Sequence, residues 1–373
     1  MDKKAFEPLR GHLGFLTSFG IPSYEISVRK ERDEVFREAG GCVRPPHPGA
    51  LYHMYSVSKP VTAFAAMALV ERGLLSLDSP VADILPEFSN LLVKEADGSL
   101  RPARTVLTVR HLLTMTSGFS YSVPADCLKH IKSSTGGLCG TRDTVRSFAS
   151  LPLEFDPGER FLYGLSLDIL AACIEVCSGL KYSNWVKSAV FDPLGMKDSR
   201  WTADKDATER MEPQYTRDIN SGEMRRVSLR NAYVFGPAYE SGGAGLISSL
   251  KDMELFAYAM AHLGTGENGC RIVKPETAEL IRKDALNERQ KKSFVWAEMD
   301  PAYSYGLGVR TCVLTEPLHL APPGEYGWSG AAGSLILASP ELGVSAVYVQ
   351  HVLMCPLERV LTPVFRGVYG AFR

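Results

Sequence analysis

The segment from Ser58 to Arg72 predicts a helix that is apolar on nearly every side, and this feature constrains the fold more than any other. Its apolar residues point in all directions: Val61, Phe64, Ala65, Met67, Ala68, Leu69 and Val70. A helix without a polar face has to lie in the middle of a core, and Gly73 is placed to end it. A chain of 373 residues, 45% of them hydrophobic, is large enough to surround such a helix.

The order of the predicted elements indicates two lobes within a single domain of residues 1–373. Alternating residues predict strands at 23–29 and 33–39, ahead of the buried helix. We further expect helices at 109–115, 142–150, 165–178, 184–191, 250–262 and 357–372, strands at 305–312, 334–337 and 344–352, and an irregular segment at 120–140. The two chain ends, 1–74 and 231–373, therefore form an α/β lobe into which a mainly α-helical lobe, 75–230, is inserted.

The charge balance argues against polyanionic partners. Lys and Arg total 41 against 42 Asp and Glu, so the net charge is -1 and no basic surplus favours nucleic acid or anionic lipid. The N-terminal residues contain no apolar run of signal-peptide length, and no apolar stretch approaches the length of a membrane span. We therefore expect a cytoplasmic protein that acts on small molecules, while the sequence leaves its oligomeric state open.

The sequence gives no sign of a metal or phosphate site. The eight cysteines are scattered, and Cys173 and Cys177 fall on one face of an apolar helix, where core packing is expected. The histidines lack the spacing of known metal motifs. The glycine-rich segment 242–245 lacks the Lys-Ser/Thr pair of a phosphate-binding loop, so we expect a tight turn there and no metal or organic cofactor.

The segment from Ser56 to Lys59, with the sequence Ser-Val-Ser-Lys, carries the sharpest chemical signal. Positions three apart on a helix share a face, so Ser56 and Lys59 would project together at the start of the buried helix. A serine hydroxyl becomes a good nucleophile when a base takes its proton, and a desolvated lysine with a depressed pKa can be that base. The alternative is structural, with Ser56 as a helix cap and Lys59 as a solvated residue.

Segments along most of the chain resemble, in matching order, the superfamily of serine β-lactamases, penicillin-binding proteins and their esterase relatives. They are residues 55–63 (YSVSKPVTA), 74–81 (LLSLDSPV), 109–118 (VRHLLTMTSG), 157–163 (PGERFLY), 242–246 (GGAGL) and 305–309 (YGLGV). The resemblance covers residues 20 to 350, approximately. It implies a β-lactamase/transpeptidase-like fold, in which an antiparallel sheet flanked by helices stands beside the helical lobe.

The resemblance also implies roles for individual residues. Tyr163 matches the tyrosine that stands opposite the nucleophile in this superfamily, where it would exchange a proton with Ser56 or with the leaving group. The backbone N–H groups of Ser56 and Ala331 would form the oxyanion hole. The catalytic residues that we expect are therefore Ser56, Lys59 and Tyr163.

Two departures from the β-lactamase pattern concern the substrate pocket. Leu165 stands where an asparagine follows the tyrosine, and the third motif, usually Lys-Thr-Gly or His-x-Gly, is Trp328-Ser329-Gly330. Trp328 removes the cation that would meet the carboxylate of a β-lactam or peptide. Leu165 replaces the asparagine whose side chain would bind the substrate amide. Together with Tyr121, these residues are expected to line the pocket.

The resulting prediction is a serine hydrolase that forms an acyl-enzyme on Ser56, a carboxylesterase for small or medium esters. A β-lactamase or D-amino-acid peptidase is an alternative, because those enzymes share the Ser-Lys-Tyr core. An acyltransferase, in which another alcohol replaces water, is a close variant. A sensor that becomes acylated and stays so is a rival from a different class.

Overall fold

The computed structural model describes residues 3–294, 302–314 and 321–373. The α-helices are α1 (Glu7–Ser18), α2 (Ser58–Glu71), α3 (Val81–Ile84), α4 (Val109–Leu113), α5 (Ala125–Ser134), α6 (Thr141–Phe148), α7 (Ser166–Ser178), α8 (Tyr182–Val186), α9 (Asp192–Leu194), α10 (Lys205–Arg210), α11 (Leu250–Ala261), α12 (Pro275–Arg282), α13 (Glu288–Lys291) and α15 (Leu357–Gly370). Short helical turns of other types are η1 (Lys3–Phe6), η2 (Tyr55–Val57), η3 (Pro86–Asn90) and the π-helical η4 (Lys187–Phe191).

The strands are β1 (Tyr24–Lys30), β2 (Asp33–Gly40), β3 (Tyr52–His53), β4 (Leu92–Lys94), β5 (Leu100–Pro102), β6 (Gln214–Arg217), β7 (Met224–Val227), β8 (Ile247–Ser248), β9 (Tyr303–Tyr305), β10 (Arg310–Cys312), β11 (Tyr326–Ser329), β12 (Leu335–Ser339), β13 (Val344–Gln350) and β14 (Val352–Leu353). Seven of them form the main sheet, in the order β2-β1-β13-β12-β11-β10-β9, with antiparallel neighbours throughout.

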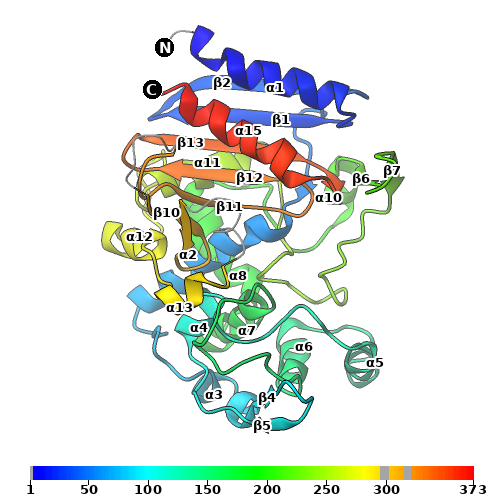
Figure 1. Ribbon diagram of the computed structural model, residues 1–373, viewed down its shortest axis with the longest axis vertical. Coiled ribbons are helices and arrows are strands. Elements are labelled where there is room, and N and C mark those ends of the chain that lie inside the picture. The colour runs from blue at the N-terminus through cyan, green and yellow to red at the C-terminus, as the bar shows by residue number, and fades with distance from the viewer. Residues whose placement is uncertain (1–2, 295–301, 315–320) are drawn as a thin grey trace.

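The main sheet joins the two ends of the chain. β1 pairs with β13 along its whole length, from Tyr24 opposite Gln350 to Lys30 opposite Val344. The helices α1 and α15 pack against each other over one face of the sheet, and α11 packs on the other (Figure 1). Every residue of β13 is buried, as a strand covered on both faces requires. The predicted α/β lobe with an antiparallel sheet is confirmed.

The helix α2 lies at the junction of the two lobes. Every residue from Ser58 to Leu69 is buried, which confirms the prediction of a helix surrounded by core. It packs against α7 and α8 of the helical lobe and against β11 of the main sheet. Gly73, at a φ of 70°, follows it in the left-handed conformation that glycine adopts without strain. The α2 helix therefore carries its first turn into the boundary between sheet and helical lobe.

Four sequence expectations need correction. The segment expected to be irregular contains α5, an amphipathic helix whose signal is weak because Ile131 is its one buried residue. The strand expected at 305–312 is two strands, β9 and β10, because Gly308 at a φ of 75° turns the chain between them. The helix expected at 184–191 begins earlier and continues through the π-helical η4 into α9, which contains Pro193 and ends at Leu194. The helix α1 was not predicted, although Leu9, Leu13 and Leu16 repeat at helical spacing.

One segment of the predicted helical lobe pairs with a strand near the C-terminal end of the chain, while the lobe boundaries themselves stay a prediction. The hairpin of β6 and β7, within the predicted helical lobe of 75–230, forms a three-stranded sheet with β14. β14 directly follows the main sheet, so this hairpin lies beside the α/β lobe (Figure 1). Hydrophobic periodicity could not reveal this, because pairing of β6 with β14 joins segments that are far apart in the sequence.

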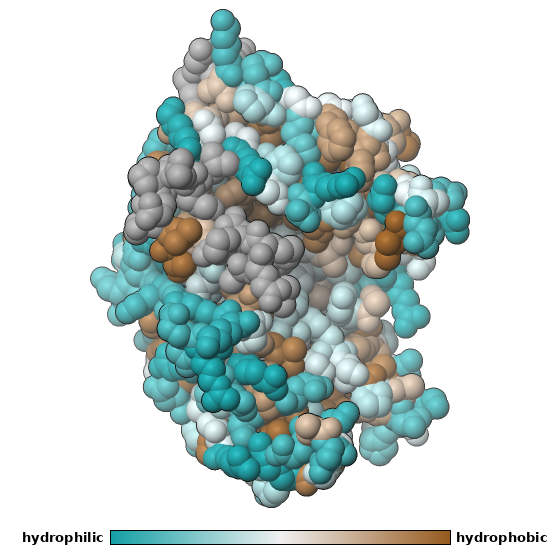
Figure 2. All heavy atoms as spheres, viewed as in Figure 1, coloured by the Kyte–Doolittle hydropathy of each residue, from teal (hydrophilic) through white to brown (hydrophobic). Residues whose placement is uncertain are grey.

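Hydrophilic and apolar residues are mixed on the visible surface (Figure 2). On the face shown in Figure 2, hydrophilic residues are spread over both lobes and apolar residues lie among them. Among the helices that the structure describes, none has both the length and the apolar character needed to cross a lipid bilayer.

Candidate active site

Ser56 lies in η2, the tight turn that leads into α2. Tyr55 adopts a φ of 48°, an uncommon conformation for a residue with a side chain, and its hydroxyl donates to Gln214 Oε1 at 2.7 Å. Ser56 remains partly exposed at the end of this turn, whereas Lys59 is fully buried. Val57 occupies the N-cap position of α2. The structural alternative is therefore wrong, because Ser56 does not cap the helix and Lys59 is not solvated.

The amino group of Lys59 stands at the centre of the site. Its Nζ donates to Ser56 Oγ at 3.2 Å, to Tyr121 Oη at 3.0 Å and to the carbonyl oxygen of Gly243 at 2.8 Å. Ser56 and Lys59 therefore lie side by side, as their spacing of three residues predicts. Burial lowers the pKa of Lys59 to about 7, although the nearby carboxylate of Asp168 opposes this shift. An amine with such a pKa is partly neutral at pH 7 and can accept a proton.

Tyr163 lies against both Ser56 and the lysine. The Nζ of Lys59 is 4.5 Å from the centroid of the Tyr163 ring, and the phenol is hydrogen-bonded to Ser56. The indole N–H of Trp328 donates to Tyr163 Oη at 2.9 Å. Burial raises the pKa of Tyr163, while the hydrogen bonds from Ser56 and Trp328 act in the opposite direction. The phenol is therefore protonated at neutral pH and suited to passing a proton between neighbouring oxygens.

The end of β11 packs directly on η2, the turn that contains Ser56. A Cβ at Gly330 would lie 2.3 Å from the carbonyl oxygen of Met54 and 2.2 Å from Ser334 Oγ. Glycine is required there because the carbonyl group of Met54 and the side chain of Ser334 fill the space. Ser329 and Gly330 thus lie close to the segment from Met54 to Ser56. The pairing of the Ser56 and Ala331 amides as an oxyanion hole stays a prediction.

The sequence matches the family described as Beta-lactamase over residues 12–353. The chain belongs to this family. Esterase EstB from Burkholderia gladioli is 32% identical over 373 residues, which cover 93% of this chain and 88% of the relative. Acyltransferase calJ from Penicillium decumbens is 26% identical over 318 residues, covering 79% of this chain and 73% of the relative. The structure of simvastatin synthase LovD from Aspergillus terreus matches with a TM-score of 0.80 at 21% identity, covering 98% of each chain, so the predicted β-lactamase/transpeptidase-like fold is confirmed.

Within this β-lactamase-family fold, two predicted pocket residues are more deeply buried than expected. Leu165 is 1% exposed and packs in the core at the start of α7. Trp328 is 2% exposed, with its ring edge-on to Tyr305 at 5.1 Å between centroids. The indole N–H of Trp328 donates a hydrogen bond to Tyr163 Oη, a contact that the sequence did not suggest. The roles of both residues in substrate selection stay predictions.

Three residues of the site were missed or underestimated at the sequence level. Tyr121, expected to line the pocket, reaches Lys59 directly. Tyr233 packs edge-on against Tyr121, with centroids 5.3 Å apart, and no sequence signal marks it. Asp168 lies buried beside Lys59, and its signal was available, because it is an acidic residue in the mostly apolar first half of a predicted helix.

Replacing Trp328 with phenylalanine tests the contact to Tyr163. Trp328→Phe keeps an aromatic ring but removes the N–H donor, so kcat for an ester should fall about tenfold, the effect of losing about 1–2 kcal/mol from one buried hydrogen bond. Steady-state kinetics would measure it. Tyr305→Phe is the matched control, because the Tyr305 hydroxyl has no hydrogen-bond partner within the described ranges. Equal losses in both variants would contradict a specific role for the indole N–H.

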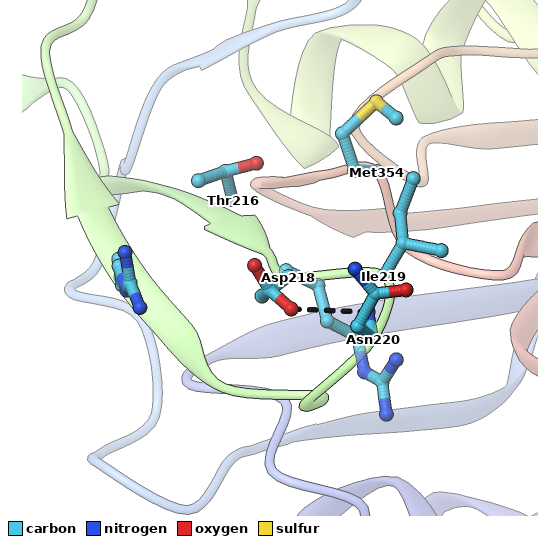
Figure 3. A pocket seen from close by; sticks show the side chains of 7 residues that line it. Thr216, Asp218, Ile219, Asn220 and Met354 are labelled. Atoms are coloured by element: carbon cyan, nitrogen blue, oxygen red, sulfur yellow. Dashed lines mark hydrogen bonds between the residues drawn. The ribbon is translucent and has the colours of Figure 1, made fainter.

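A pocket of about 300 Å³ lies elsewhere, at the turn of the β6–β7 hairpin. Figure 3 shows Thr216, Asp218, Ile219 and Asn220 around it, with Met354 opposite. Asp218 accepts hydrogen bonds from the backbone N–H groups of the turn and so stabilises the loop. None of the predicted site residues lines this pocket. In the part of the chain that the structure describes, no group of three or more His, Cys, Asp or Glu side chains could hold a metal ion.

Proposed function

We propose that this protein is a carboxylesterase that forms an acyl-enzyme on Ser56. The observation that carries the proposal is the position of Lys59, whose buried amino group lies 3.2 Å from Ser56 Oγ with a pKa of about 7. A neutral amine at that distance can take the proton of the hydroxyl as it attacks. Tyr163 adds a second proton-transfer group that touches Ser56.

Acylation begins when Ser56 Oγ attacks the acyl carbonyl and passes its proton to Lys59. The backbone N–H groups of Ser56 and Ala331 stabilise the negative charge on the carbonyl oxygen in the tetrahedral intermediate. The bond to the alcohol then breaks, and the alcohol leaves with a proton delivered through the phenol of Tyr163. Because Tyr163 contacts Ser56 and lies over Lys59, this proton has a short path.

Deacylation reverses these steps with water as the nucleophile. Lys59, neutral again once its proton has left with the alcohol, takes a proton from water as the water attacks the ester carbonyl on Ser56. The bond to Ser56 Oγ breaks, and the proton returns to that oxygen, so the carboxylic acid is released and the enzyme is restored. None of these steps requires a metal or an organic cofactor.

The preference for esters over β-lactams rests on Trp328 and Leu165. Trp328 offers an N–H donor that is already engaged by Tyr163, and it supplies no cation for a carboxylate. Leu165 is apolar and buried, so it offers no amide group to the substrate. The relative EstB, which is named an esterase, supports the same preference.

A paired assay tests this preference. The purified enzyme is given a short-chain p-nitrophenyl ester and a chromogenic cephalosporin, and kcat/KM is measured for each. We expect ester turnover with little cephalosporin cleavage. Dominant cephalosporin turnover would favour a β-lactamase and would show that Trp328 does not decide the substrate. A burst of one equivalent without turnover of either compound would favour an acylated sensor.

Acyl transfer to an alcohol is a second candidate, favoured by the aromatic surroundings of the nucleophile. The rings of Tyr121, Tyr163 and Tyr233 pack against one another beside Lys59, which gives an organic acceptor apolar surface to bind. The relative calJ is named an acyltransferase. Adding an alcohol during ester turnover and quantifying the new ester against the free acid separates transfer from hydrolysis.

A further inference from the structure

Asp168 is a buried acid that the mechanism above does not use. It lies in the first turn of α7 and is 2% exposed. Its Oδ1 accepts hydrogen bonds from Tyr239 Oη at 3.0 Å and from Ser241 Oγ at 2.6 Å. An acid in such a place costs folding free energy unless its partners and a nearby cation compensate, so its presence beside the site calls for a physical reason.

The backbone of Gly243 contacts both Asp168 and Lys59. The carbonyl oxygen of Gly243 accepts from Lys59 Nζ at 2.8 Å, and its N–H is hydrogen-bonded to the carboxylate of Asp168. A Cβ at Gly243 would lie 2.6 Å from Asp168 Oδ2 and 3.5 Å from Lys59 Nζ. A side chain at this position would therefore displace the carboxylate of Asp168, which explains the glycine here.

Asp168 acts on Lys59 through the backbone of Gly243 and by its charge. The carboxylate favours the protonated amine, whereas burial of Lys59 favours the neutral one. Other titratable or charged groups lie on elements packed against α2. They are Tyr55 of η2, Cys173, Glu175 and Cys177 of α7, Tyr182 of α8, Lys187 of η4, Glu276, Glu279 and Arg282 of α12, and Tyr326 of β11. Tyr121 and Tyr163 face Lys59 from loops. Among the described residues, Asp168 is the charged group that acts on the amine.

We infer that Asp168 is a positioning residue for the reaction at Ser56. Asp168 holds the amino group of Lys59 in place through the backbone of Gly243. The negative charge of Asp168 also favours the protonated amine and so opposes the effect of burial on Lys59. The inference rests on the proposed function in one respect, that Lys59 is the base for Ser56. Without Asp168, Lys59 becomes a weaker base that is neutral at lower pH.

The variant Asp168→Asn removes the charge and keeps the shape of the side chain. The titration of Lys59 is followed through its ¹³Cε resonance in lysine-labelled protein, with the signal assigned by its loss in Lys59→Met. We expect the midpoint to move down by about one pH unit. The rising limb of kcat/KM against pH should move with it. Tyr239→Phe, which removes one of the donors that hold the carboxylate, should give a smaller shift in the same direction.

Asp252→Asn is the matched control, because Asp252 is also a buried acid in the first turn of a helix and accepts from the backbone N–H groups of Asp198 and Ser199. It should leave the Lys59 midpoint unchanged. An unchanged midpoint in Asp168→Asn, or in Tyr239→Phe if the first variant does not fold, would overturn the inference. Failure of the proposed function is seen separately, as absence of ester turnover in the wild-type protein, while the Lys59 titration can still be measured.

Discussion

Ser56→Ala is expected to lower ester turnover by about 10⁴-fold or more, because no acyl-enzyme can form without the hydroxyl. Ser56 is partly exposed, and its Oγ lies 3.2 Å from the buried Nζ of Lys59. Steady-state kinetics with a p-nitrophenyl ester give the loss in kcat/KM. Mass spectrometry of quenched wild-type enzyme should show one added acyl group, located on the peptide that contains Ser56, and this mass increase should vanish in the variant.

The neighbouring Ser58 provides the matched control. Its Oγ donates to the carbonyl oxygen of Tyr55 at 2.6 Å and accepts from the N–H of Leu246 at 3.0 Å, so its role is to tie the nucleophile turn to β8. Ser58→Ala should lower the free energy of unfolding by about 1–3 kcal/mol, because a buried N–H loses its acceptor. It should still acylate at Ser56. Full activity of Ser56→Ala would mean that the proposed nucleophile is wrong.

Lys59→Met is expected to lower kcat/KM by about 10³-fold, within the range that general-base catalysis contributes. Methionine fills a similar volume but cannot accept a proton. Lys59→Arg should be equally impaired, because a guanidinium stays protonated at any pH that the protein tolerates. Circular dichroism and thermal unfolding, recorded with the kinetics, would separate lost chemistry from lost folding.

The pKa of the Lys59 amine determines how kcat/KM of the wild-type enzyme should depend on pH. Because burial lowers the pKa of Lys59 to about 7, the neutral form that acts as a base is populated above that pH and disappears below it. The kcat/KM for a neutral ester should therefore rise with pH through a midpoint near 7 and then level off. The small residual activity of Lys59→Met should lack this rise. A profile with its midpoint near pH 10, or a rise that persists in Lys59→Met, would contradict the role given to the lysine.

Local sequence determined much of the architecture and part of the site. The apolar residues of α2 repeat in every direction, and this alone places the helix in the core. The spacing of Ser56 and Lys59 then places both side chains at the start of that helix, because helix geometry brings residues three apart onto one face. The strands at both chain ends also follow from local patterns, and the order of the elements led to the α/β lobe with its helical insertion.

The tertiary structure decided which distant groups meet at Lys59 and Tyr163. Tyr121 and Gly243 approach Lys59 from 62 and 184 residues away, and Trp328 reaches Tyr163 across 165 residues. Hydrophobic periodicity reports which face of an element is buried, but it does not report which side chain of a distant segment lies opposite that face. The burial that lowers the pKa of Lys59 likewise arises from the packing of both lobes around α2. The sequence therefore determined which residues we propose as nucleophile and base. Packing of the two lobes decided the environment that lowers the pKa of Lys59, because desolvation and hydrogen bonding depend on contacts between segments far apart in the chain.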